Sequence, residues 1–185
     1  MYAKRQIILI ALLSTICVAA SAATGTAPDA NSPESVVRQF LETMKTAGAA
    51  QAASEFTHPD ECARLKVLVM PRIRRSFETA GDDFPKKTLG EALPLSAIEK
   101  LAPCSFLKKF LWQSQMDGTA VKSTKFTGRV REGDVVRLTV LTDLVDLEGK
   151  PARREDVLAL KAFGQTWRMM LSPELEAYVQ ILIKS

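Results

Sequence analysis

Histidine is nearly absent from this chain of 185 residues, in which His58 is the only one. Without a second histidine or a cysteine at ligand spacing, a metal site or a histidine proton relay lacks its parts. The sequence also has no Gly-x-Ser-x-Gly motif, which carries the nucleophile of many serine hydrolases, and no glycine-rich loop that would cradle a phosphate. These absences predict a protein without a metal or other cofactor, and they argue against serine hydrolysis.

Cysteine is scarce as well, with three residues in the whole chain, and the first of them, Cys17, lies in a segment typical of a secretory signal peptide. Two basic residues precede an apolar run over 7–20, and a small-x-small cleavage site follows at 20–22. The run is shorter than the ~20 residues that cross a bilayer. We therefore expect residues 1–22 to be removed, leaving a secreted or periplasmic protein without a membrane span.

The mature chain would keep two cysteines, Cys62 and Cys104. In an oxidising compartment, two cysteines favour one disulfide. The alternative is a pair of separate buried thiols, because free cysteine is often buried in protein cores.

A strong excess of one charge is also missing. The signal peptide holds two basic residues and no acidic one, so its removal lowers the formal net charge from +4 to +2. The basic pairs at 74–75, 86–87, 108–109 and 153–154 are separated by acidic residues, whereas nucleic-acid-binding proteins cluster their positive charge. We therefore expect a mixed, solvated surface and no nucleic-acid partner.

The second half of the chain contains an alternating apolar pattern, centred on residues 135–144. The even-numbered positions there are apolar or Thr and share one face of a strand, while Arg137 and Asp143 lie on the opposite face. This alternation predicts an antiparallel sheet with one covered and one solvated face. Further strands are expected over 121–130, 156–163 and 166–171.

Helices are expected before and after the strands in the sequence. Ser32, Pro33 and Glu34 form a helix start that combines a cap, a favourable first residue and an acidic group near the positive end of the helix dipole. Ser172 opens a matching start for a C-terminal helix. Pro71 is expected to end or kink the helix that follows His58. The remaining predicted segments are helices over 49–56, 95–102 and 105–115, and a loop over 78–94.

This order of elements resembles the NTF2-like (cystatin-like) superfamily, in particular its small secreted bacterial members with no assigned activity. The segments that carry the resemblance are SPESVVRQF at 32–40, DVLALK at 156–161 and FGQTWR at 163–168. The resemblance implies one α+β domain over 32–185, preceded by a flexible lead-in over 23–31. It also implies a curved antiparallel sheet that forms a cone with the N-terminal helices, closed by a C-terminal helix, with a natural pocket for an apolar ligand.

Two functions of different kinds are compatible with such a fold. The first is a non-catalytic module that binds an apolar small molecule, a lipid or a protein partner, including a second copy of itself through the sheet. The alternative is a small isomerase or lyase of the ketosteroid-isomerase or polyketide-cyclase type, using His58, Asp60 or Asp156. The inward positions of the central strand hold no ionisable group, and Asp156 is expected at a strand start, so the non-catalytic reading is favoured. His58 itself would act either as a general base or as a loop residue that orients a helix start.

The predicted pocket raises a further alternative, because large apolar residues can either line a cavity or fill it. If the interior is open, a buried carboxylate or imidazole inside it would favour the enzyme, and an entirely apolar lining would favour the binding module. If the aromatic and Met side chains fill it, the exposed face of the sheet is left for dimerisation. The residues expected to line or fill this interior are Phe40, Met44, Val136, Leu138, Val140 and Trp167.

Overall fold

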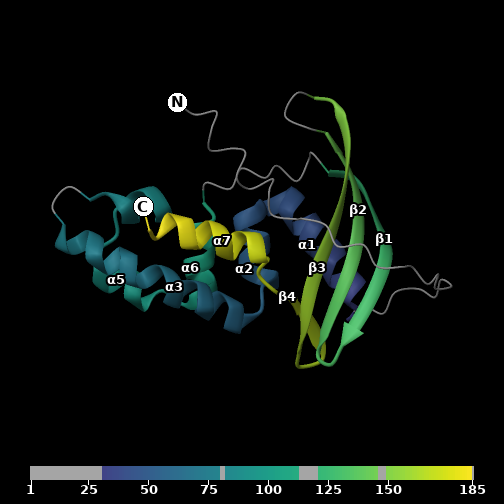
Figure 1. Cartoon of the computed structure of the whole chain (residues 1–185), viewed down its shortest axis with the longest axis horizontal. Helices are drawn as coiled ribbons and strands as arrows, with labels where there is room; N and C mark the ends of the chain where they lie inside the picture. The colour runs from purple at the N-terminus through teal and green to yellow at the C-terminus, as the bar shows by residue number, and fades with distance from the viewer. Residues whose placement is uncertain (1–30, 80–81, 113–120, 146–148, 185) are drawn as a thin grey trace.

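The structure, a computed structural model, is α+β. Helices come first, a four-stranded antiparallel sheet follows, and one helix closes the chain (Figure 1). This class and this order of elements confirm the prediction. The predicted signal peptide and all but the last residue of the predicted lead-in lie outside the described residues. The described residues are 31–79, 82–112, 121–145 and 149–184.

The bounds of the elements place the helical part before the sheet. No helix among the described residues is long and apolar enough to cross a membrane. The helices are α1 (Pro33–Ala47), α2 (Ala49–Phe56), α3 (Pro59–Glu78), α4 (Phe84–Leu89), α5 (Leu95–Lys100), α6 (Pro103–Phe110) and α7 (Pro173–Leu182). The strands are β1 (Val121–Glu132), β2 (Val135–Val145), β3 (Pro151–Phe163) and β4 (Thr166–Met169).

Helices α1 and α7 begin at the capping sequences that predicted them. The Ser32 hydroxyl accepts a hydrogen bond from the Ser35 N–H at 3.2 Å, and Pro33 occupies the first turn of α1. The Ser172 hydroxyl does the same for the Leu175 N–H at 3.3 Å. Each cap satisfies an N–H that has no partner within the first helical turn, which fixes where the helix starts.

Helix α3 continues through Pro71 to Glu78, so this proline does not end the helix, which was one of the two outcomes expected of it. Proline removes the hydrogen bond to the carbonyl four residues earlier, which belongs to Val67. Both residues lie on the exposed face of α3. Val69 and Ile73, both fully buried, anchor the turns on either side of the proline. Tertiary packing therefore overrides the local preference.

The segment 78–94, expected to be mostly loop, contains a short helix, α4, over part of its length. Phe84 and Leu89 are buried in the helical core, and this burial stabilises a helix too short to form alone. Asp82 accepts hydrogen bonds from the Arg72 guanidinium at 2.6 Å and from the Phe84 N–H at 2.9 Å. The hydrogen bond from Arg72, followed by that from the backbone, lowers the pKa of Asp82 below its ordinary value.

Helix α6 begins at Pro103 rather than at the predicted cap, Ser105, and ends at Phe110. Pro103 suits a first helical position because its missing N–H would have no partner there. Residues 113–115 of the predicted helix lie outside the described part of the chain.

The sheet has the strand order β1-β2-β3-β4, with every neighbouring pair antiparallel. On β2 the side chains of Val136, Leu138 and Val140 are at most 2% exposed, and those between them are more exposed, as the alternating pattern predicted. We call the face that carries these three residues the inner face, and the opposite one the outer face. Strand β3 is longer than predicted, because it starts at Pro151 rather than near Asp156.

The apolar interior is divided among clusters rather than gathered in one place. One cluster joins α1 to the inner face of the sheet through Val36 and Val37. A separate, larger cluster lies among α3 and the helices packed on it, and includes Phe106 and Val179. Figure 1 shows α1 beside the sheet and α3, α5, α6 and α7 gathered farther out on the same side. Within the described residues, no helix covers the outer face.

Candidate functional site

The centre of the inner face is in contact with α1. Val36 and Val37 are 4% and 0% exposed and belong to the same buried cluster as Val136, Leu138 and Val140. Three of the residues expected to line a pocket are therefore packing contacts of helix against sheet. A ligand on this face would have to lie beyond the area that α1 occupies.

The other residues expected at the pocket are divided between two clusters. Met44, 3% exposed, packs with Ala49 and Ala52 where α1 meets α2, and Phe40 lies against this cluster. Trp167 borders the sheet cluster, and the guanidinium of Arg131 lies 5.7 Å from its ring centroid. The six residues therefore belong to two different clusters of apolar side chains.

The inner face also carries an ion pair, which the sequence interpretation missed. In the antiparallel register, Asp156 lies opposite Val140 and Arg154 lies opposite Thr142. Directly opposite residues share a face of the sheet, and both Val140 and Thr142 are buried on the inner face. The Arg154 Nε donates to the Asp156 carboxylate at 2.8 Å, with the two side chains 22% and 11% exposed. The inner face is therefore not entirely apolar.

One hydrogen-bond donor of Arg154 is buried in the protein without an acceptor. Its Nη2 atom is buried and has no hydrogen-bond partner. A buried donor without an acceptor is costly, and such groups are rare in folded proteins. The Asp156 carboxylate holds the Nε side of the same guanidinium and so fixes the direction of the group. Within the described residues, this charged N–H therefore has no acceptor.

His58 is buried, 5% exposed, at the start of α3. Its backbone N–H donates to the Met169 carbonyl at 2.8 Å, and its ring packs edge-on against Phe163 with centroids 5.4 Å apart. The Nδ1 atom accepts a hydrogen bond from the Asp60 N–H at 3.2 Å, so a neutral ring carries its proton on Nε2. His58 thus caps α3 and joins the start of this helix to β4.

The three acid–base candidates do not meet in one site. The Asp60 carboxylate lies 3.6 Å from the His58 Nδ1 but is 77% exposed. Asp156 is four residues along β3 from Leu160, the partner of Met169, which corresponds to about 13 Å of strand. His58 lies at the Met169 end of that distance. A catalytic pair of His58 with Asp156 is therefore not assembled.

Cys62 and Cys104 lie at disulfide distance, with Cα atoms 5.1 Å apart, and connect α3 to α6. Cys62 is completely buried within the helical cluster. The pairing is compatible with an oxidising compartment. Among the residues that the structure describes, no group of three or more His, Cys, Asp or Glu side chains could hold a metal ion.

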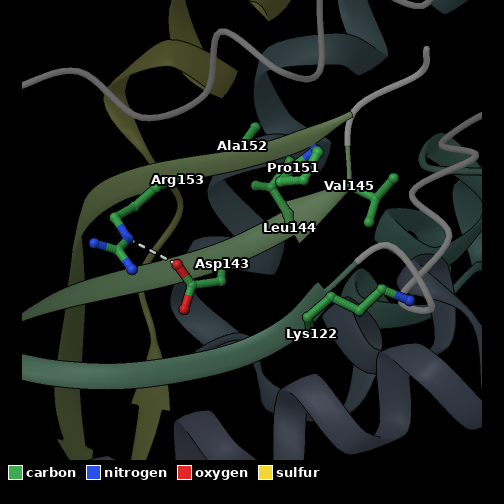
Figure 2. Close-up of a pocket in the computed structure, with 7 residues that line it drawn as sticks. All are labelled: Lys122, Asp143, Leu144, Val145, Pro151, Ala152 and Arg153. Carbon is green, nitrogen blue, oxygen red and sulfur yellow. Dashed lines mark hydrogen bonds and ion pairs between the residues drawn. The ribbon is translucent and has the colours of Figure 1, made fainter. Parts of the chain in front are cut away.

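Two clefts lie on the surface of the described part of the molecule, and neither is lined by Val136, Leu138 or Val140. One, of about 350 Å³, lies on α3 beside Pro71. The other, of about 410 Å³, lies at the ends of β2 and β3 (Figure 2). It is lined by Lys122, Asp143, Leu144, Val145, Pro151, Ala152 and Arg153.

The charged groups of the strand-end cleft largely satisfy one another. Asp143 accepts from the Ser123 hydroxyl and from the Arg153 Nε, each at 2.7 Å. These two hydrogen bonds, that from Ser123 first, lower the pKa of the Asp143 carboxyl below its ordinary value. Figure 2 shows Arg153 turned toward Asp143 and Lys122 extended away from both. Unlike Arg154, this cleft offers no buried donor that lacks a partner.

No family model, curated protein or solved structure matches this chain. The most informative group is the Arg154–Asp156 pair. The sequence contained a signal for it, since residues two apart share a face of a strand, but using that signal required the true start of β3.

Proposed function

We propose that this protein is a non-catalytic, extracytoplasmic binding module for an amphipathic small molecule or lipid. The polar head of the ligand accepts a hydrogen bond from Arg154 on the inner face of the sheet. The observation that carries the proposal is the buried Arg154 Nη2, which has no acceptor within the protein. The relationship to the NTF2-like superfamily, and a signal peptide that directs export, are parts of the same proposal.

The surroundings of Arg154 support an amphipathic ligand rather than a fully polar one. Leu158, which is only partly buried and lies two residues along β3 from Asp156, offers apolar contact for a chain or ring. Thr142, opposite Arg154 in the register, adds a hydroxyl on the inner face. Binding sites for small molecules typically combine mostly apolar walls with a few placed polar groups. The matching head group is a carboxylate, phosphate or carbonyl oxygen, because guanidinium N–H groups bind such acceptors strongly.

The absence of an assembled acid–base pair supports binding rather than catalysis. The His58 Nδ1 is occupied by the Asp60 N–H, and the Asp156 carboxylate is engaged by Arg154. A small isomerase or lyase is the second candidate, favoured by one observation: Asp156 is a carboxylate only 11% exposed on the inner face. In that case the Asp156→Asn variant would bind the ligand and lose turnover, whereas a binding module has no turnover to lose.

Native mass spectrometry on protein exported to a bacterial periplasm tests the proposal. We expect the wild type to carry a reproducible small molecule that organic extraction releases, and the Arg154→Met variant to lose it. Arg153→Met is the matched control, because Arg153 is the neighbouring arginine but belongs to the outer-face pair with Asp143. It should keep the ligand.

Two results would contradict the proposal: a wild-type mass without any bound molecule, or full retention of the ligand by Arg154→Met. Circular dichroism should first establish that both variants fold. If Arg154→Met does not, Arg154→Lys provides the test, because lysine keeps the charge but lacks the fixed fork of donors. This variant is expected to retain less ligand than the wild type.

A further inference from the structure

Strand β1 is a long edge strand. It pairs with β2 on one side, and no other strand of the described sheet lies on its other side. The opposite edge, β4, is four residues long, and Thr57 forms a parallel bridge to its Met169. β1 spans 12 residues, most of them exposed. The edge of β1 that does not pair with β2 therefore presents the N–H and C=O groups to which another strand could be added.

The charge of β1 is strongly one-sided. It contains four cations, Lys122, Lys125, Arg129 and Arg131, and one anion, Glu132. Arg129 is paired with Glu34 of α1 at 3.2 Å. In the described part of the chain, neither Lys122 nor Lys125 has a carboxylate within ion-pair distance. The two lysines therefore leave an uncompensated positive potential along the edge.

This charge pattern decides which kind of strand the edge can accept. A second copy would bring together two edges that each carry Lys122 and Lys125 without a partner carboxylate among the described residues. Like charges directly opposite each other destabilise a strand pair. A strand rich in Asp or Glu would instead be attracted, because its acidic side chains would lie beside the lysines of β1.

We propose that β1 is a docking edge for an acidic, extended segment of a partner protein, which adds to the sheet as a fifth strand. Main-chain hydrogen bonds supply affinity in this mode of recognition, and side chains along the strand supply specificity. Lys125 selects acidic residues, and Val130, 46% exposed, offers an apolar contact to the residue beside it. The proposal is independent of the ligand at Arg154.

The probe is a short synthetic peptide that alternates Glu and Val, with its binding followed by fluorescence anisotropy at low salt. We expect it to bind at least about tenfold more tightly than the same peptide with Lys in place of Glu. A third peptide keeps the Glu side chains but is N-methylated at alternate residues, which removes the donors needed for strand addition. It should bind about tenfold more weakly than the unmodified peptide.

Protein variants locate the binding site on β1. Lys125→Glu should weaken binding of the acidic peptide about tenfold, whereas Lys86→Glu, an exposed change on α4, should not alter it. Arg154→Met should bind the peptide like the wild type, which separates this proposal from the ligand proposal. The inference is overturned if the N-methylated peptide binds as well as its parent, because the contact would then be charge alone. It is equally overturned if a single-stranded oligonucleotide binds more tightly and displaces the peptide, or if no peptide binds.

Discussion

Replacement of both Cys62 and Cys104 by alanine should lower the free energy of unfolding by about 4 kcal/mol, measured by urea denaturation. The crosslink closes a loop with a sequence separation of 42 residues, and a loop of that size restricts the unfolded chain by about this amount in the chain-entropy model. Because Cys62 is fully buried, truncation to alanine also leaves a small cavity in the helical core. The loss should therefore not fall below the entropic value unless the disulfide is strained.

Reductant provides the control for this prediction. It should destabilise the wild type by nearly the same amount as the double substitution, and it should leave the Cys62→Ala/Cys104→Ala variant unchanged. The prediction fails if two thiols titrate in the unreduced, unfolded protein. That result would mean that Cys62 and Cys104 are neighbours without a covalent bond, and it would remove the main structural support for an oxidising compartment.

The second large effect concerns the Arg154–Asp156 pair. Arg154→Met should cost about 3 kcal/mol of stability, because it leaves a mostly buried carboxylate without its guanidinium. Combining it with Asp156→Leu should recover most of this loss, since replacing both members of a buried pair with apolar residues is often neutral or stabilising. The double variant also removes the buried Nη2, which has no acceptor in the protein.

Arg153 and Asp143 provide the matched control for this double-mutant cycle. They form an equivalent pair on the outer face, with side chains 67% and 44% exposed. Exposed pairs typically contribute less than about 1 kcal/mol, so Arg153→Met should be nearly silent. Strictly additive losses for Arg154→Met and Asp156→Leu would show that the inner-face pair is not coupled. A silent Arg154→Met would show that the group is not buried in solution.

The features predicted correctly from the sequence are those that short-range chemistry determines. Ser32 and Ser172 cap their helices because a hydroxyl at the N-cap position can accept a hydrogen bond from the N–H three residues later. The central strand was recognisable because its apolar residues alternate. This spacing places them on one face of a strand, whereas in a helix they would be spread around the axis. The approach of Cys62 to Cys104 was predicted only as one of two alternatives, since spacing along the chain does not determine distance in space.

The features that were missed depend on partners far along the chain. The first residues of β3 include Arg153, Arg154 and Glu155, whose pattern contains no apolar alternation, and they form a strand because β2 offers hydrogen bonds along its whole length. Helix α4 forms because Phe84 and Leu89 are buried by neighbouring helices. Without the true start of β3, the position of Asp156 on the inner face could not be inferred, and Arg154 was not recognised as a candidate.

NMR of the arginine side chains can show whether Arg154 binds the head group of a ligand. Protein labelled with ¹⁵N-arginine should be compared before and after organic extraction, with the Nε–H signals of Arg153 and Arg154 assigned from the two Met variants. We predict that extraction shifts or broadens the Arg154 signal and leaves the Arg153 signal in place. Identical spectra before and after extraction would contradict the account, because Arg154 would then contact no extractable molecule.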